Sequence, residues 1–336
     1  MSKQTVLNES SKGLFRRWWR FITIGIAIVL IVFILRSISL DELLQSLRRL
    51  AVMPLLVAFG LNIIVYLLMA FRWRILYAVV ETPPAFLYLV KVTIVSVFFN
   101  TILPSVVGGD TYRMLQLRHY ADTSSNLEHS FAIVFVDRVV GLVGLIMFGC
   151  IGMLLNSTAV SFDVAFITVL LLLVLLAILN MSMHYGAYAT FLKFLRWLPS
   201  KQLKVVEQTL NRIYQNISIY RSHRTLLVQA IVLSLLLRFF WFIAGYYVGL
   251  SLSLDVPLIM FIVFLPIIEI IRMIPLTIQG IGVREGLFIL FFGTVGVTNS
   301  DAVLLATLIY LMATVVGIVG GFIYLGDNLL SVRLQK

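Results

Sequence analysis

Ten ionisable side chains lie within or beside long apolar stretches of the sequence, where a charge is costly. They are Lys91, Asp110, Arg113, Asp137, Arg138, Arg238, Glu269, Arg272, Arg284 and Glu285. An ionised side chain at the centre of a membrane-spanning helix costs about 2.5 to 3.5 kcal/mol on insertion scales, so it is placed against a partner or a water-filled cavity. Arginines in such a place could hold a phosphate, and carboxylates could balance them or bind an amine. We expect these residues to mark the functional site.

Two motifs rich in Pro and Gly interrupt apolar runs next to several of these charges. They read Asn100-x3-Pro104-x3-Gly108-Gly109-Asp110-x2-Arg113 and Pro275-x4-Gly280-Ile281-Gly282-Val283-Arg284-Glu285. In the first motif the break precedes a predicted helix from Thr111 to Tyr120, whose free N–H groups and positive end would favour a phosphate. The candidate substrate-binding residues therefore also include Asn100, Pro104, Gly108, Gly109, Pro275, Gly280 and Gly282.

Several of these charges also have a purely structural interpretation. Asp110 could serve as a helix N-cap. Glu269 and Arg272 are three residues apart on a predicted helix and could neutralise each other. Asp137 and Arg138 could form an ordinary pair at the membrane interface. These alternatives remain open at the level of the sequence.

The composition excludes a water-soluble protein. Apolar residues make up 61% of the 336 residues and charged residues 12%, about half of the usual share in globular proteins. The net charge of +11 comes from basic residues in a few polar segments, a pattern typical of membrane topology signals rather than of a nucleic-acid interface. Cys150 is the only cysteine, the four histidines lack metal-ligand spacing, and no nucleotide-binding motif occurs. We expect no metal and no cofactor, and an enzyme is the less favoured class.

Six apolar runs are long enough to cross a bilayer core of about 30 Å as helices. They are Trp19–Leu35, Val52–Phe71, Ser130–Leu155, Asp163–Met183, Leu226–Leu250 and Ala302–Leu325. Two further runs, Phe86–Leu103 and Pro257–Leu290, are broken by Pro and Gly and are predicted to enter the membrane and turn back. The predicted fold class is an all-α polytopic membrane protein with about six full spans and two re-entrant helical elements.

The basic residues predict the orientation of the chain. Segment 184–225 carries seven Lys or Arg residues against one acid, Glu207, so the positive-inside rule assigns it to the cytoplasm. If both broken runs are re-entrant, segment 1–18 and the tail 331–336 are also cytoplasmic, and Arg72 and Arg74 mark a cytoplasmic helix end. Segment 36–51, with three arginines, departs from the rule. Residues 19–330 would form one transmembrane domain of a bacterial inner membrane.

A shift of 171 residues relates the two halves of the sequence. The superposed pairs are Pro104 with Pro275, Gly109 with Gly280, Arg113 with Arg284 and Gly149 with Gly320. The repeat-like units 52–155 and 226–325 would run in opposite directions, an arrangement that lets transporters open a shared site to either side. Chance matching among abundant Gly and Leu is the alternative. Segment Lys201–Tyr220 has one apolar face and is predicted to lie along the cytoplasmic surface near anionic lipid.

At the two Pro- and Gly-containing motifs, the sequence resembles the lysylphosphatidylglycerol synthase/flippase transmembrane-domain family, the membrane half of the multiple peptide resistance factor. The likeness extends from about Trp19 to Leu330. It implies a polytopic domain with re-entrant helices that, in the best-known members, moves aminoacylated phosphatidylglycerol between leaflets. Bifunctional members also carry a soluble aminoacyl-transfer domain; this sequence stops at Lys336 without one, so we do not expect synthase activity. Stand-alone and archaeal relatives associated with polyisoprenyl-linked sugars leave the substrate open.

The leading functional hypothesis is a lipid translocase that holds a headgroup phosphate with its arginines while the acyl chains stay in the bilayer. Alternating access of two inverted units would carry the headgroup across. One alternative is an integral-membrane enzyme or accessory factor that acts on lipid-linked sugars, with the acids as proton donors. A second is a secondary transporter of a small anion. The expected partner is a membrane lipid and not nucleic acid; a homo-oligomer and an associated lipid- or glycan-modifying enzyme remain open.

Overall fold

The structure, a computed structural model, describes residues 40–79, 83–102, 108–120, 127–156, 162–182, 184, 186, 188–190, 193, 203–273, 277 and 280–334. Its elements are α2 (Leu40–Arg48), α3 (Val52–Tyr77), α4 (Phe86–Ile102), α5 (Gly108–Tyr120), α6 (Leu127–Leu155), α7 (Phe162–Ser182), α9 (Leu203–Ser218), the short 3-10 helix η1 (Ile219–Arg221), α10 (Arg224–Ser251), α11 (Leu258–Arg272), α12 (Val283–Gly293) and α13 (Asn299–Leu334). No strand occurs in these ranges, so the predicted all-α class is confirmed. The predicted span Trp19–Leu35, Pro104 and Pro275 lie outside the described residues.

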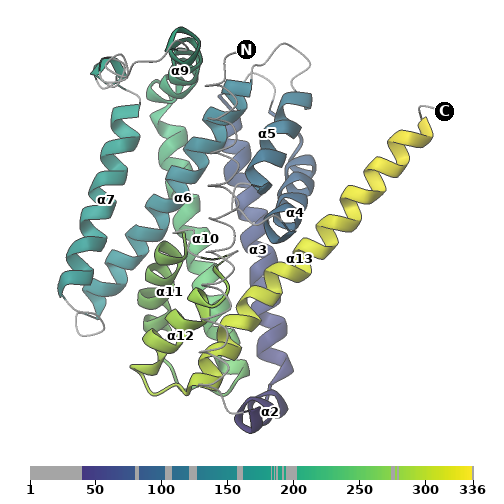
Figure 1. Ribbon diagram of the computed structural model, residues 1–336, viewed down its shortest axis with the longest axis vertical. Coiled ribbons are helices and arrows are strands. Elements are labelled where there is room, and N and C mark those ends of the chain that lie inside the picture. The colour runs from purple at the N-terminus through teal and green to yellow at the C-terminus, as the bar shows by residue number, and fades with distance from the viewer. Residues whose placement is uncertain are drawn as a thin grey trace, which may run out of the picture.

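Four helices within the described ranges are long and apolar enough to cross a membrane. They are Val52–Tyr77, His129–Leu155, Arg224–Ser251 and Asn299–Asp327. Each contains one of the predicted spans. α7 contains residues 163–182 of the predicted span Asp163–Met183, and within it Phe166–Ile178 counts as a shorter apolar helix. It runs beside α6 along the long axis of the molecule (Figure 1).

The two runs broken by Pro and Gly form helical hairpins rather than complete spans. α4 has 17 residues and α11 has 15, so at 1.5 Å per residue they extend about 25 and 22 Å, less than the bilayer core. α5 packs back against α4, and α12 packs against α11. Figure 1 shows the α4–α5 hairpin in the half of the bundle that carries α9, and the α11–α12 hairpin in the half that carries α2. The two hairpins therefore lie in opposite halves of the bundle. Their entry into the membrane from opposite sides stays a prediction.

Each hairpin packs against a long helix from the other half of the chain. α4 contacts α13, α11 contacts α6, and α3 lies along α10. Glycine permits both close approaches: a Cβ at Gly320 of α13 would lie 2.8 Å from the carbonyl carbon of Ile94. One at Gly149 of α6 would lie 3.3 Å from Cβ of Pro266. The 171-residue shift that superposes Gly149 on Gly320 also superposes Val95, a neighbour of Gly320, on Pro266. These contacts are thus equivalent in the two halves.

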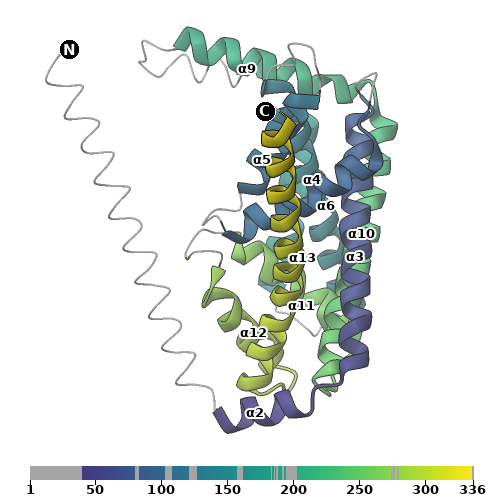
Figure 2. The same cartoon turned by 90° about the vertical axis from the view of Figure 1, so that its right-hand side faces the viewer.

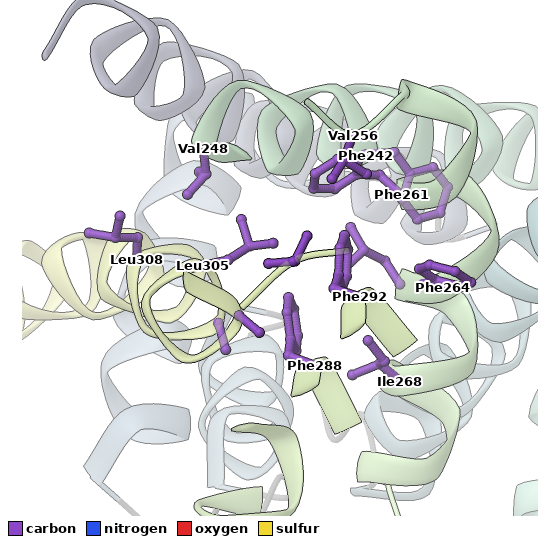
Figure 3. Close-up of a cluster of buried hydrophobic side chains, with 14 of the residues drawn as sticks. Phe242, Val248, Val256, Phe261, Phe264, Ile268, Phe288, Phe292, Leu305 and Leu308 are labelled. Atoms are coloured by element: carbon purple, nitrogen blue, oxygen red, sulfur yellow. The ribbon is translucent and has the colours of Figure 1, made fainter. Parts of the chain in front are cut away.

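A cluster of phenylalanines holds the α11–α12 hairpin in place (Figure 3). Phe288 and Phe292 of α12 stack with ring centroids 5.3 Å apart, and Phe261 of α11 meets Phe292 edge to face at 5.0 Å. All three rings are buried, and Leu305 of α13 packs in the same cluster. Such aromatic pairs contribute about 0.5 to 1.5 kcal/mol each beyond the area that they bury. Packing of this kind is what joins helices in lipid, because apolar burial alone drives little association there.

α9 lies across the end of the bundle and is joined to it at its C-terminal end (Figure 2). Ile217 is buried and Ile213 packs against the same core cluster as α3 and α6. The Tyr220 hydroxyl donates a hydrogen bond to the Leu76 carbonyl at 2.8 Å, and burial raises the pKa of Tyr220, so the hydroxyl stays a donor. The predicted amphipathic segment is therefore helical, but part of its apolar face packs on protein rather than on lipid.

Candidate functional site

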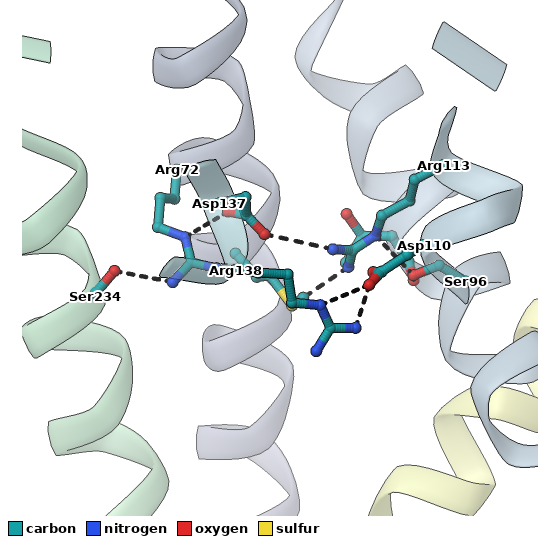
Figure 4. A network of polar contacts seen from close by, with 9 residues as sticks. Arg72, Ser96, Asp110, Arg113, Asp137, Arg138 and Ser234 are labelled. Carbon is teal, nitrogen blue, oxygen red and sulfur yellow. Dashed lines mark hydrogen bonds and ion pairs between the residues drawn. The ribbon is translucent and has the colours of Figure 1, made fainter. Parts of the chain in front are cut away.

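A network of buried charges joins α3, α5, α6 and α10 (Figure 4). Asp137 of α6 lies at its centre: Oδ1 accepts a hydrogen bond from Arg72 Nε at 2.8 Å, and Oδ2 lies 3.7 Å from Arg113 Nη1. Arg72 also donates through Nη1 to the Ser234 hydroxyl at 2.8 Å. The side chains of Asp137, Arg72 and Arg113 are 3%, 6% and 2% exposed. One buried carboxylate therefore serves two buried arginines.

Arg113 is held in place by contacts with α4 and α3. Its Nε donates to the Ser96 hydroxyl of α4 at 3.0 Å, and its guanidinium lies 5.0 Å from the centroid of the Trp73 ring of α3. A cation over an aromatic face is stabilised by the ring quadrupole. The α4–α5 hairpin is thus attached to α3 through a charged side chain rather than by apolar packing alone.

Asp110 and Arg138 form the part of the network that is most open. Arg138 Nε and Nη2 donate to Asp110 Oδ2 and Oδ1 at 2.6 and 2.8 Å, a bidentate pair. The Arg138 side chain is 38% exposed and that of Asp110 is 14% exposed. The consecutive residues Asp137 and Arg138 therefore each pair with another helix. The N-cap interpretation of Asp110 is wrong, because α5 already begins at Gly108 and Asp110 lies within its first turn, where it forms a bidentate ion pair.

The turn into α5 depends on Gly109. Its N–H donates to Asn100 Oδ1 at 2.8 Å, so the Asn100 side chain links the two legs of the hairpin. α5 begins at Gly108, three residues earlier than predicted. A Cβ at Gly109 would lie 2.7 Å from Asn100 Cγ and would press on the Ser96 carbonyl oxygen. A glycine is therefore required where the two legs approach most closely.

Replacing Gly109 by Ala is expected to lower the stability of the protein by about 1 to 3 kcal/mol, because the methyl group must push the two legs apart. Gly60→Ala is the matched control: Gly60 lies on α3 with nothing within 4 Å of the added Cβ. Thermal unfolding of the purified variants in detergent gives the comparison. Identical midpoints for the two variants would contradict the close approach seen at Gly109.

The second hairpin carries its own two ion pairs. Arg272 Nη2 donates to Glu269 Oε2 at 2.7 Å, as the spacing of three residues predicted. Arg284 pairs with the adjacent Glu285, whose Oε2 accepts a hydrogen bond from the Gly282 N–H at 2.7 Å. The Arg284 guanidinium also lies 4.4 Å from the Tyr310 ring centroid. Arg284 thus resembles Arg113, its partner under the 171-residue shift, in being buried against an aromatic ring.

Two glycines shape the turn before α12. Gly280 and Gly282 have φ values of +73° and +84°, a backbone region that glycine adopts without strain. A Cβ at Gly280 would lie 2.7 Å from Cγ of Arg272, so the Arg272 side chain packs over this glycine. The predicted motif is therefore a turn. Its Gly280 leaves room for the Arg272 side chain, and its Gly282 precedes the first residue of α12, the helix that contains Arg284.

Arg238 of α10 is half-buried, and the charges that act on it come from both groups, Glu269 and Arg272 of α11 and Arg72 and Arg138 of α3 and α6. Its guanidinium is 5.6 Å from the Trp241 ring centroid. No carboxylate of the described residues lies within 4.0 Å of it. Arg238 therefore adds a half-buried cation without a direct counter-ion among the described residues. The term central site is used below for this residue together with the five arginines and four acids of the ion pairs described above.

The central site contains Arg72, Asp110, Arg113, Asp137, Arg138, Arg238, Glu269, Arg272, Arg284 and Glu285. Lys91, a candidate from the sequence, does not join it: its Nζ lies 2.6 Å from Asp327 Oδ2 at the α4–α13 contact, and both side chains are about two-fifths exposed. Among the described residues no group of three or more His, Cys, Asp or Glu could hold a metal ion.

Sequence reasoning missed several members of the site. Arg72 was interpreted as a topology signal, but α3 continues to Tyr77, so Arg72 lies more than a turn inside the helix and is buried. Ser96, Trp73 and Tyr310 were not considered. The apolar and aromatic residues that follow, Trp73 and Ile75–Tyr77, were the available signal that the helix goes on past Arg72.

The sequence matches the family model described as the lysylphosphatidylglycerol synthase TM region over residues 20–321. The chain belongs to this family. It is similar to two proteins of Methanothermobacter thermautotrophicus, each named UPF0104 membrane protein. The first is 23% identical over 335 residues, covering 93% of this chain and 93% of the relative; the second is 23% identical over 295 residues, covering 83% and 86%. No solved structure matches the chain.

Membership in the family confirms the resemblance inferred from the two motifs. The matched region contains both hairpins and every residue of the central site. Together with the four long apolar helices, it makes the protein a multi-pass membrane protein. The two relatives are matched over most of their own length, so the likeness concerns the membrane domain as a whole rather than a short motif.

Proposed function

We propose that the protein moves the phosphate-containing headgroup of a membrane lipid from one leaflet to the other. The observation that supports this best is the central site itself, a set of arginines and carboxylates buried in a bundle whose outer surface is apolar. A soluble protein could place such charges at its surface, but in a bilayer each is costly, which favours a role in binding.

Arg138 is well suited to receive the phosphate. It is the most exposed arginine in the Asp137 and Asp110 ion pairs, and Asp110 occupies its bidentate face. A phosphate presents the same pair of oxygens to a guanidinium as a carboxylate does. A lipid headgroup that approaches Arg138 could therefore take the place of Asp110, which would then be free to pair with an amine or with a neighbouring arginine.

The two hairpins could provide a path for the lipid headgroup, with one ion pair at each hairpin. Asp110 belongs to the α4–α5 hairpin and pairs with Arg138 of α6, whereas Glu269 and Arg272 pair within the α11–α12 hairpin. A headgroup could pass from one pair to the other while the acyl chains stay in lipid. Opening each half in turn would give alternating access. With the orientation predicted from the basic residues, the half with α9 faces the cytoplasm.

The direct test is exchange of fluorescent phosphatidylglycerol in proteoliposomes, read by dithionite, which quenches label only in the outer leaflet. We expect the wild-type protein to expose inner-leaflet label. Arg138→Gln should slow this exchange by about tenfold or more, because it removes a charge-assisted bidentate contact.

Arg74→Gln is the matched control for this experiment. Arg74 is an exposed arginine of α3 outside the central site, so its loss should leave the exchange rate near that of the wild type. Gel filtration shows whether both variants stay folded. Equal rates for Arg138→Gln and wild type would refute the proposed role of the central site, and a change in the mass of the lipid would instead favour an enzyme.

A further inference from the structure

We infer that α2 is a lipid-binding helix that lies in the surface of the bilayer and contacts anionic phospholipid headgroups. This surface is separate from the central site. The inference concerns lipids that surround the protein and requires no movement of lipid between leaflets. It follows from the position of α2, from the division of its surface into three faces and from the place of one arginine.

α2 lies at the level where the apolar surface of the bundle ends. The candidate span of α3 begins at Val52, directly after the short connection that follows α2. Val52 and Met53 are exposed, so the apolar outer surface of α3 extends up to this connection. Figure 2 shows α2 lying across the end of the bundle opposite α9. A helix in this place lies in the plane of the membrane interface if it is amphipathic.

One face of α2 is fixed to the protein. The Ser46 hydroxyl donates a hydrogen bond to Asp301 Oδ1 at 2.6 Å, and Glu42 Oε2 accepts one from the Ser300 hydroxyl at 2.9 Å. Leu43, one turn before Ser46, packs against the core cluster of the α11–α12 hairpin. These contacts hold α2 against the start of α13 and prevent its rotation. The other faces of the helix therefore point in fixed directions.

The rest of the α2 surface divides into an apolar face and a polar face. Leu44 and Leu47 are three residues apart, so they share a face, and they are 52% and 44% exposed. Gln45 and Arg49 lie on another face, where Arg49 Nη2 donates to Gln45 Oε1 at 3.2 Å in an exposed hydrogen bond. A helix of this kind places its leucines in the boundary between headgroups and acyl chains and its polar face in water.

Arg48 supplies the contact with the headgroups. It is exposed and lies one turn after Leu44, at the edge of the apolar face. An arginine in this position buries its aliphatic stem against apolar surface and keeps its guanidinium among the headgroups. No carboxylate of the described residues lies within 4.0 Å of it. A lipid phosphate complements this charge, which gives Arg48 a role other than that of a topology signal.

The immersion of α2 is tested with one fluorescent label at two neighbouring positions. Single cysteines replace Leu44 or Gln45 after Cys150, the only native cysteine, is changed to Ser. The proteins are placed in nanodiscs of phosphatidylcholine and phosphatidylglycerol in equal amounts. Brominated acyl chains quench a label in the bilayer, and iodide quenches a label in water. We expect bromine to quench the Leu44→Cys label several-fold more than the Gln45→Cys label, and iodide to give the opposite order.

The preference for anionic lipid is measured with bromine on one lipid at a time. At the Leu44→Cys label, brominated phosphatidylglycerol should quench as if enriched about fivefold over brominated phosphatidylcholine, the effect of one arginine near an anionic surface. Arg48→Gln should remove this preference. Arg74→Gln is the matched control, because it removes an exposed arginine at the opposite end of α3 and should leave the preference unchanged.

Three results would overturn the inference. The first is equal quenching of the two labels by bromine and by iodide. The second is a Leu44→Cys label that neither quencher reaches, which would mean that a protein segment or a second copy of the chain covers this face. The third is a preference for phosphatidylglycerol that is absent from the wild-type helix or survives Arg48→Gln. None of these readouts depends on lipid exchange between leaflets, so a failure of the proposed translocation is detected separately.

Discussion

Replacing Asp137 by Asn is expected to lower the free energy of unfolding by about 3 to 5 kcal/mol, the cost of removing one partner from a buried ion pair. The asparagine keeps the shape of the side chain but removes the carboxylate that lies within 4.0 Å of both Arg72 and Arg113. Both guanidinium groups would then stay buried without their nearest counter-ion. The expected result is a large drop in the midpoint of thermal unfolding in detergent.

A matched control variant and a rescue variant test whether the loss of stability comes from the unpaired arginines. Asp255→Asn removes an exposed acid from the connection between α10 and α11 and should change the midpoint little. Adding Arg72→Gln to Asp137→Asn restores the original net charge of the group and should recover part of the loss. If Asp137→Asn unfolded at the same temperature as Asp255→Asn, Asp137 would not be the counter-ion of two arginines.

The second large effect is expected at Gly320. Replacing it by Val should cost more than about 3 kcal/mol and abolish lipid exchange, because overpacking at this contact cannot be relieved by a side-chain rotation. The atoms that a Cβ would meet are backbone atoms of α4: the carbonyl oxygen and carbon of Ile94, and the Cα of Val95 at 3.1 Å. The helices α4 and α13 would have to separate.

Gly326→Val provides the comparison on the same helix. No atom lies within 4 Å of a Cβ added at Gly326, so this variant carries the same change in helix propensity without the clash. Unfolding midpoints and exchange rates of the two variants are compared with those of the wild type. Similar behaviour of both valine variants would mean that α13 does not pack closely on α4.

The architecture was predictable because its signals are local. Long apolar runs predict spans, and Pro with Gly predicts the breaks that turn α4 and α11 into hairpins. The exception is the end of α3, which was predicted at Phe71 and lies at Tyr77. A basic residue usually ends an apolar run at the interface, but here Arg72 is neutralised by Asp137 from another helix, so the helix continues into the protein.

The membership of the site was harder to predict because pairing is a property of the fold. The sequence shows that Asp137, Arg138 and Asp110 are costly in lipid, but nothing local tells which cation each carboxylate meets. Neighbours in sequence even mislead, since Asp137 and Arg138 pair with different helices. Lys91 has the same local signal as Arg113 and yet meets Asp327 away from the centre. Only the pair Glu269 and Arg272, one helical turn apart, could be assigned from spacing.

Because each hairpin packs against a long helix of the other half of the chain, the order of synthesis affects how the protein folds. α4 acquires its closest neighbour only when α13 is synthesised, about 200 residues later. Until α13 has been made, the face of α4 that later packs against Gly320 has no partner helix, and the charged residues of α5 are already in the membrane. If the two halves of the chain are expressed as separate fragments, we expect each to be degraded when made alone. When both are made together they should protect each other from proteolysis, because each fragment contains the helices that pack against the other.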